Sequence, residues 1–228
     1  MPATYRQYTK HWINTESEQN KKKRAGTAHS ILKKYYPTSK ITLRYATPVQ
    51  LLVSVMLSAQ CTDKKVNEVT AAFFNKYKTA KDYARIKMKT LEGFIRPTGF
   101  YHSKAKNIVR TTRILEKRFG GKLPKTMEEM LKLPGVARKT ANVVLINAYG
   151  IVEGIPVDTH VGRIAQRLGF SNTDNPKKIE HDLMKLFPKK EWGMLSYRLI
   201  DHGRNVCTAK NRKCVKCPLK KLCPSSLM

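Results

Sequence analysis

The amino-acid sequence predicts an all-α protein, and three observations support this fold class. Helix start and stop signals recur along the chain from Ala25 onward. Between those signals, apolar residues return at the three- and four-residue spacing of one helix face. No stretch alternates convincingly between polar and apolar residues at the period of two that a half-buried strand shows. With 41% hydrophobic residues among 228, the chain suits a folded globular protein.

Four helices are expected before residue 135. A Thr-Pro pair opens an apolar helix at 48–57, and Thr62 can cap the next helix. A third helix covers 101–119, and two consecutive glycines end it. Thr126 and Glu129 form the pattern of a capping box ahead of the fourth. In the rest of the chain, helices are expected at 138–148, 159–168, 176–186 and 191–206.

Charge is the outlying feature of the composition. Lysine and arginine number 45 against 16 aspartate and glutamate residues, which gives a formal net charge of +29. Such an excess favours a polyanionic partner, because each phosphate that is neutralised releases condensed counterions. Nucleic acid is the leading candidate partner, an anionic membrane surface is the rival, and the charge exceeds what solubility alone needs.

Two further features of the sequence bear on the cellular compartment. The longest apolar stretch, 49–59, is well short of the roughly 20 residues that a membrane-spanning helix needs. Residues 1–24 lack the apolar core of a secretory signal and end in a basic run, so we expect a flexible basic arm. These features predict an intracellular protein, where thiols are kept reduced.

The segment 133–141 predicts a helical hairpin. A short helix ends at Pro134-Gly135, and a second helix starts almost at once near Arg138. Such a turn can direct successive backbone N–H groups outward at the start of the second helix, where the helix dipole is positive. The segment therefore predicts a phosphate-binding site, although an ordinary helix–turn–helix corner would have the same local pattern.

Four of the five cysteines lie near the C-terminus. Cys207, Cys214, Cys217 and Cys223 are separated by six, two and five residues. Four thiolates on one compact loop suit a four-iron four-sulfur cluster or a tetrahedral zinc ion. Zinc sites usually pair two Cys-x-x-Cys knuckles, and only one is present here. The spacing therefore modestly favours an iron–sulfur cluster over zinc. A disulfide pair is the weaker third alternative.

Several motifs together resemble the endonuclease III family. The resemblance covers about residues 25–224 with the motifs in the same order along the chain. It is carried by the hairpin, the cysteine spacing, Leu57-Ser58-Ala59-Gln60 followed by Thr62-Asp63, Gly99-Phe100-Tyr101-His102-Ser103-Lys104-Ala105, and Val157-Asp158-Thr159-His160-Val161-Gly162-Arg163.

The resemblance implies a two-domain helix–hairpin–helix DNA glycosylase fold. A six-helix barrel domain is expected at 41–152, and an iron–sulfur cluster domain is expected to join 25–40 to 153–228. It also implies that the four cysteines hold a 4Fe-4S cluster that braces a basic loop. The implied partner is double-stranded DNA with a damaged base or abasic site, and the implied protein is a cytoplasmic, nucleoid-associated monomer with no membrane contact.

The implied activity is that of a bifunctional DNA glycosylase and AP lyase. Lys139 is expected to attack the sugar carbon that carries the base and to form a Schiff base, after which β-elimination breaks the strand. Asp158 is expected to stabilise positive charge on the sugar, and it can also cap the helix that follows. Oxidised pyrimidines are the implied substrates, while photodimers and mismatched thymine belong to close relatives.

The resemblance also implies residues that contact DNA. Gln60 and Phe100 correspond to residues that enter the duplex when the lesion leaves it, although Phe100 could instead be a core aromatic. Asp63 and His160 are expected to line the lesion pocket. The hairpin contacts are expected from Gly135, Ala137, Arg138 and Thr140, with Ala137 at a position where the family commonly has glycine.

Two rival functions share this scaffold. An adenine-mismatch glycosylase lacks lysine at position 139 and carries an additional C-terminal domain, whereas here Lys139 is present and five residues follow Cys223. A non-catalytic iron–sulfur DNA-binding protein would not need both Lys139 and Asp158. We therefore expect the enzyme of base excision repair rather than either rival.

Overall fold

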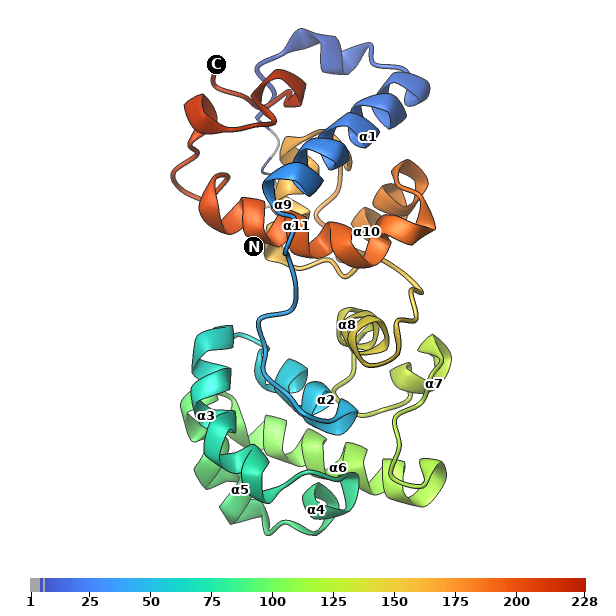
Figure 1. Cartoon of the computed structure of the whole chain (residues 1–228), viewed down its shortest axis with the longest axis vertical. Helices are drawn as coiled ribbons and strands as arrows, with labels where there is room; N and C mark the ends of the chain where they lie inside the picture. Colours follow the sequence, from blue (N-terminus) through green and yellow to red (C-terminus); the bar gives the residue numbers. More distant parts are fainter. Residues whose placement is uncertain (1–4, 6) are drawn as a thin grey trace. The chain divides into compact units, whose positions relative to one another are not determined.

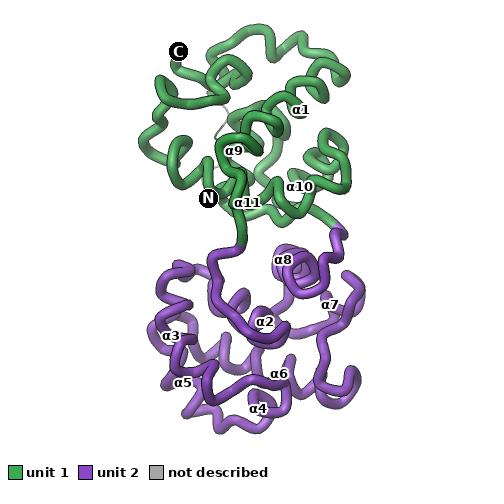
Figure 2. Tube along the Cα trace, viewed as in Figure 1, with its two compact units in different colours: residues 1–40, 154–228 green, residues 41–153 purple. Residues whose placement is uncertain are grey.

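A computed structural model describes residues 5 and 7–228 of the chain. All regular secondary structure in this part is helical, apart from one isolated bridge between Cys207 and Arg212. The chain divides into two compact units, 1–40 with 154–228 and 41–153, which Figure 2 shows in different colours. No helix of the described part is long and apolar enough to cross a membrane. The expected all-α fold class is confirmed.

The unit formed by 41–153 is built around α2. Every residue of α2 from Val49 to Leu57 is buried, and the side chains of Leu51, Leu52 and Leu57 are almost completely excluded from solvent. The helices of this unit, labelled in Figure 1, are α2 (Pro48–Leu57), α3 (Asp63–Lys76), α4 (Ala80–Arg85), α5 (Met88–Ile95), α6 (Tyr101–Phe119), α7 (Met127–Leu131) and α8 (Arg138–Tyr149), with the 3₁₀ turn η2 (Arg96–Thr98).

The second unit joins both ends of the chain around one core. Ala25, Ala28 and Leu32 of the first helix pack with apolar residues of the C-terminal helices, such as Ile164 and Leu199. Its helices are α1 (Glu18–Tyr35), α9 (Thr159–Arg167), α10 (Pro176–Leu186) and α11 (Trp192–Asn205). The 3₁₀ turns are η1 (His11–Asn14), η3 (Lys189–Glu191), η4 (Cys214–Lys216) and η5 (Lys220–Leu222).

The expected helices are found with small shifts at their ends. The bounds of α2, α6 and α10 agree with the sequence-based ones. Those of α8 and α9 differ by one residue at one end, and those of α11 differ by one residue at each end. The expected capping box at Thr126 is wrong in one detail. Thr126 caps α7 as expected, but the Glu129 carboxylate accepts from the Thr126 hydroxyl at 3.0 Å and not from the Thr126 backbone amide. A reciprocal capping box occurs instead at Thr79 and Asp82, ahead of α4.

The N-terminal segment differs from the flexible arm that the sequence predicted for 1–24. Residues 1–4 and 6 lie outside the described residues, but α1 already begins at Glu18, where the Ser17 hydroxyl accepts from the Asn20 amide at 3.2 Å. The backbone amides of Thr9 and Lys10 donate to the Pro224 carbonyl at 2.7 and 3.1 Å. These contacts tie the segment to the C-terminal loop of the same unit.

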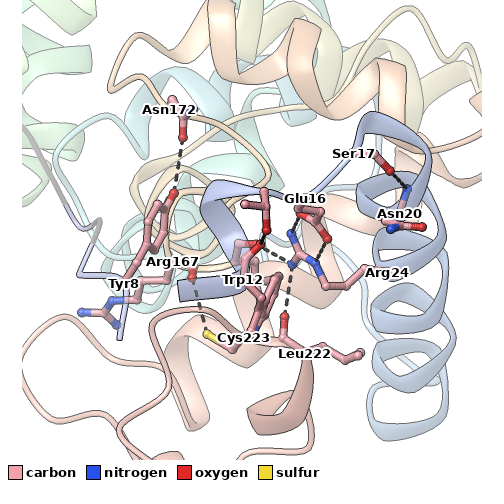
Figure 3. Close-up of polar contacts among 12 residues, drawn as sticks. Tyr8, Trp12, Glu16, Ser17, Asn20, Arg24, Arg167, Asn172, Leu222 and Cys223 are labelled. Carbon is pink, nitrogen blue, oxygen red and sulfur yellow. Dashed lines mark hydrogen bonds and ion pairs between the residues drawn. The ribbon is translucent and has the colours of Figure 1, made fainter. Parts of the chain in front are cut away.

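Arg24 is the physical reason for this order (Figure 3). Its guanidinium forms two 2.7 Å bonds with the Glu16 carboxylate and donates to the carbonyls of Leu168 and Leu222 at 2.6 and 3.1 Å. It also lies 5.0 Å from the ring centroid of Trp12. A buried arginine needs such partners, because an unpaired buried charge is costly.

Candidate active site and metal centre

The predicted hairpin is formed by α7, a short turn and α8. Val136 donates its amide to the Leu133 carbonyl at 3.1 Å across the turn. Gly135 has a φ of +75°, and a Cβ at this position would lie 3.0 Å from the side chain of Asn107. Both the backbone conformation and the close approach of α6 therefore require glycine.

The start of α8 has no capping side chain. Ala137 occupies the N-cap position and offers no side-chain acceptor, whereas Thr47, Thr62 and Asn175 each cap their helices. The first-turn amides of α8 and the positive end of its dipole thus form a site suited to an anion. Ala137 has φ −86° and ψ 167°, so its methyl group causes no left-handed strain.

Lys139 lies in the first turn of α8 and is exposed. Arg138 and Thr140 flank it in the same turn and are half-buried. An exposed amine directly beside an uncapped helix N-terminus can contact a ligand whose anionic group binds there.

Asp158 lies in the other unit, where it caps α9. One carboxylate oxygen accepts from the backbone amides of His160 and Val161, both at 2.8 Å. The second oxygen lies 3.2 Å from Nδ1 of His160. The dual role expected for Asp158 includes this cap, and its proximity to Lys139 stays a prediction because the two residues belong to different units.

Gln60 and Phe100 lie on one cavity of the 41–153 unit. The cavity has a volume of about 230 Å³, and its lining also includes Met56, Ser103 and Gly135. Phe100 is 66% exposed, so it is not a core aromatic. The structure thus brings both expected duplex-entering residues and the hairpin glycine to one place.

Both residues have a left-handed backbone. Gln60 has φ +53° and Phe100 has φ +48°, and no other non-glycine residue of the described part has a positive φ. The left-handed region is sterically unfavourable for a residue with a bulky side chain, and such conformations concentrate at functional sites.

The two lesion-pocket candidates have local partners. Asp63 begins α3, and its carboxylate accepts a short hydrogen bond from the Thr42 hydroxyl. Asp63 is not among the residues that line the cavity beside Gln60. His160 belongs to the other unit, in the first turn of α9.

The four C-terminal cysteines line one cavity, and none of the five cysteines forms a disulfide. Burial raises the pKa of Cys217 to about 11 and that of Cys223 to about 12. No group of three or more His, Cys, Asp or Glu side chains within the described residues is placed to hold a single metal ion. As a donor set, four thiols around one cavity suit a thiolate-bound cluster.

Arg167, a buried residue at the end of α9, contacts the loop that carries the cysteines. Its guanidinium donates to Sγ of Cys207 at 3.1 Å and to the carbonyls of Thr208 and Ala209 at 2.7 and 3.0 Å. A cation that donates to a sulfur stabilises a thiolate, which is the form that binds iron. Sequence reasoning missed this residue, because nothing local distinguishes it among so many basic residues.

Comparison with known proteins identifies the class of protein to which this chain belongs. Residues 53–189 match the model of the HhH-GPD superfamily base excision DNA repair protein. Endonuclease III of Synechocystis sp. is 51% identical over 207 residues, covering 91% of this chain and 94% of the relative. Endonuclease III of Bacillus subtilis is 43% identical over 189 residues, covering 82% and 86%.

Solved structures agree with the sequence relatives. A non-covalent endonuclease III–DNA complex and a trapped endonuclease III–DNA covalent intermediate each match with 42% identity and a TM-score of 0.86, covering 90% of this chain and 96% of theirs. A thermostable thymine-DNA glycosylase matches with 23% identity and a TM-score of 0.81, covering 90% of this chain and 97% of its own, and this likeness concerns the fold.

The chain therefore belongs to the HhH-GPD superfamily of base excision DNA repair proteins. Within it, the chain is a member of the endonuclease III family, whose members typically bind a 4Fe-4S cluster through C-terminal cysteines. It is accordingly a DNA N-glycosylase and AP lyase of base excision repair, as the sequence predicted.

Proposed function

We propose that this enzyme removes oxidised pyrimidines from double-stranded DNA with Lys139 as its nucleophile. The observation that carries the proposal is the placement of Lys139, exposed in the first turn of a helix that no side chain caps. The relatives of known structure that bind DNA, one of them covalently, support the same partner for this chain.

The hairpin holds the DNA backbone in this proposal. Amides of Arg138 and Thr140 in the first turn of α8 donate to a phosphate, and the Arg138 side chain adds charge. Gly135 lets the turn pass close to α6, and the methyl group of Ala137 faces solvent beside the phosphate. The sugar of the damaged nucleotide is then presented to Lys139.

The chemistry needs an amine. Nζ of Lys139 attacks C1′, the new N–C bond forms as the glycosidic bond breaks, and the base leaves with the electron pair and takes up a proton. The sugar ring opens to an imine, loss of a C2′ proton breaks the C3′–O bond, and water hydrolyses the imine to regenerate the amine. The Asp158 carboxylate stabilises the positive charge that develops on the sugar.

Gln60 and Phe100 open the duplex. A damaged base must leave the stack to reach a nucleophile, and this costs a few kcal/mol of stacking and pairing. The exposed ring of Phe100 stacks on the separated bases, while Gln60 fills the vacated position. Asp63 and His160 are the proposed lining of the pocket that receives the flipped base.

The four C-terminal cysteines are the proposed ligands of a 4Fe-4S cluster. Their placement around one cavity and the Arg167 hydrogen bond to Cys207 support this assignment. When bound, the cluster supplies a rigid cross-link for the loop and no chemistry on the base. The basic residues of the loop, such as Lys216 and Lys221, are then held on an ordered surface.

The remaining proposals concern the domains of the chain, its oligomeric state and its location in the cell. We infer that 41–153 forms the six-helix barrel domain and that 1–40 with 154–228 forms the cluster domain. We also propose that the protein is a monomer and that it acts in the cytoplasm, on the DNA of the nucleoid.

Single-turnover excision from a panel of duplexes tests the proposed substrate class. Each duplex carries one defined lesion: an oxidised pyrimidine, a pyrimidine photodimer or a mismatched thymine. We expect the oxidised pyrimidine to be released fastest. Faster release of the photodimer or of mismatched thymine would assign the enzyme to one of the related specificities, while a Lys139→Gln control shows that release belongs to this enzyme.

A further inference from the structure

Lys104 is a buried lysine that the proposed reaction does not use. It is 6% exposed and lies in the first turns of α6. No carboxylate of the described residues forms an ion pair with it, and burial lowers the pKa of its ammonium group. A buried ammonium is costly to keep, so its partners have to account for its presence.

Those partners are two backbone carbonyls from separate segments. Nζ of Lys104 donates to the carbonyl oxygen of Leu57 at 2.8 Å and to that of Thr98 at 2.8 Å. Leu57 is the last residue of α2, and Thr98 is the last residue of η2. The ammonium thus satisfies helix-terminal carbonyls that would otherwise lack a donor, at the negative end of the α2 dipole.

The two segments lead directly to the two left-handed residues. Gln60 follows the end of α2 in the turn that precedes α3, and Phe100 follows the end of η2 at the N-cap of α6. The backbone amide of Lys104 also donates to the Phe100 carbonyl at 3.0 Å. One residue therefore contacts the Phe100 backbone and anchors both segments.

We infer that Lys104 is a positioning residue: it holds the backbone segments that carry Gln60 and Phe100 in the arrangement in which both side chains can enter the duplex. The inference rests on the proposed wedge role of these two residues. Residues in unfavourable backbone conformations persist only where the surroundings fix them. Lys104 restrains the Phe100 backbone directly, and it fixes the end of α2 three residues before Gln60. Lys104 itself lines the cavity between them, so it can act without touching the reacting sugar.

A double-mutant cycle on single-turnover excision tests the inference. The variants are Lys104→Met, Phe100→Ala and the double variant. All are assayed on one lesion-containing duplex, at a temperature below the melting temperature of the least stable variant. We expect Lys104→Met to slow excision about tenfold in the wild-type background and by clearly less in the Phe100→Ala background, where only the effect through Gln60 remains. Lys117→Met on the exposed C-terminal part of α6 is the matched control and should match wild type.

Two outcomes would overturn the inference. An equal slowing by Lys104→Met in both backgrounds, or none, would overturn the inference while leaving the wedge role intact. If Phe100→Ala is as fast as wild type, the wedge role itself is wrong and the inference fails with it. If Lys104→Met does not fold at the assay temperature, Lys104→Gln takes its place in the cycle and the same criterion applies. The glutamine amide leaves polar N–H donors in the site, but its side chain is one bond shorter than that of lysine, so it does not hold both carbonyls as the ammonium does.

A second readout follows duplex opening directly. 2-Aminopurine placed beside the lesion brightens when it is unstacked, so its fluorescence change on binding reports entry of the wedge. We expect a smaller change with Lys104→Gln than with wild type at saturating protein, and partial recovery with Lys104→Arg. An unchanged amplitude in folded Lys104→Gln would show that the residue has only a structural role.

Discussion

Gln60 and Phe100 share a backbone conformation that no other non-glycine residue of the described chain adopts. They come from different segments, and their side chains line the same cavity. Neither residue is needed there for packing, because both Gln60 and Phe100 are exposed. Under the proposed wedge role, the strain at the two positions is the cost of presenting these side chains to DNA.

The first prediction separates strain from function at Phe100. Glycine tolerates a φ of +48°, whereas alanine does not, so Phe100→Gly should be more stable than Phe100→Ala by about 1 kcal/mol. Both variants should excise a lesion from duplex DNA much more slowly than wild type. Denaturant unfolding and single-turnover excision measure the two effects, and a more stable alanine variant would mean that the left-handed conformation is absent in solution.

The second prediction concerns the buried ion pair of the N-terminal segment. The side chains of Arg24 and Glu16 are 8% and 7% exposed, so Glu16→Gln leaves a charged guanidinium without its counter-ion. We expect a loss of about 3 kcal/mol in the free energy of unfolding. Glu18→Gln, at an exposed position of α1, is the control, and equal stability of the two variants would contradict the order seen in this segment.

The third prediction addresses DNA affinity through salt dependence. Deleting 1–24 would remove the Arg24 network, so substitution of the exposed Lys22 and Lys23 by alanine is the cleaner test of the basic segment. Each phosphate contact that is lost should reduce the slope of log affinity against log salt by about 0.9. Arg138→Gln in the hairpin should reduce the slope by about the same amount, and a slope unchanged by either variant would exclude that region from the phosphate contacts.

The fourth prediction concerns the cysteine cavity. Purified protein should be yellow-brown, with near-equal iron and acid-labile sulfide, and stoichiometric zinc without sulfide would contradict the assignment. Arg167→Met should lower the iron and sulfide content because Cys207 loses its donor. Lys221→Met, exposed on the same loop, is the matched control.

Local signals were sufficient for much of the fold. The Thr47-Pro48 start and the Gly120-Gly121 end gave correct helix bounds because caps act within one turn of a helix. The short helices α4 and α5 were not predicted, since neither is long enough to show a clear apolar period.

Non-local contacts could not be predicted in the same way. The sequence places Arg24 in a flexible arm, because its partner carbonyls, such as that of Leu222, lie far away in the sequence. Lys104 was part of a recognised motif, but the carbonyl of Leu57 that explains its burial belongs to another helix. The sequence could name candidate residues such as Gln60 and Phe100, but it contained no sign of their shared backbone conformation.

Borohydride trapping is the most direct test of Lys139 as the nucleophile. Reduction of the imine should link wild-type protein covalently to duplex DNA that contains an abasic site or an oxidised pyrimidine. We predict that Lys139→Gln abolishes trapping while it still binds the same DNA, and that Lys117→Gln traps like wild type. Covalent trapping and strand cleavage by Lys139→Gln at the wild-type rate would show that another amine is the nucleophile.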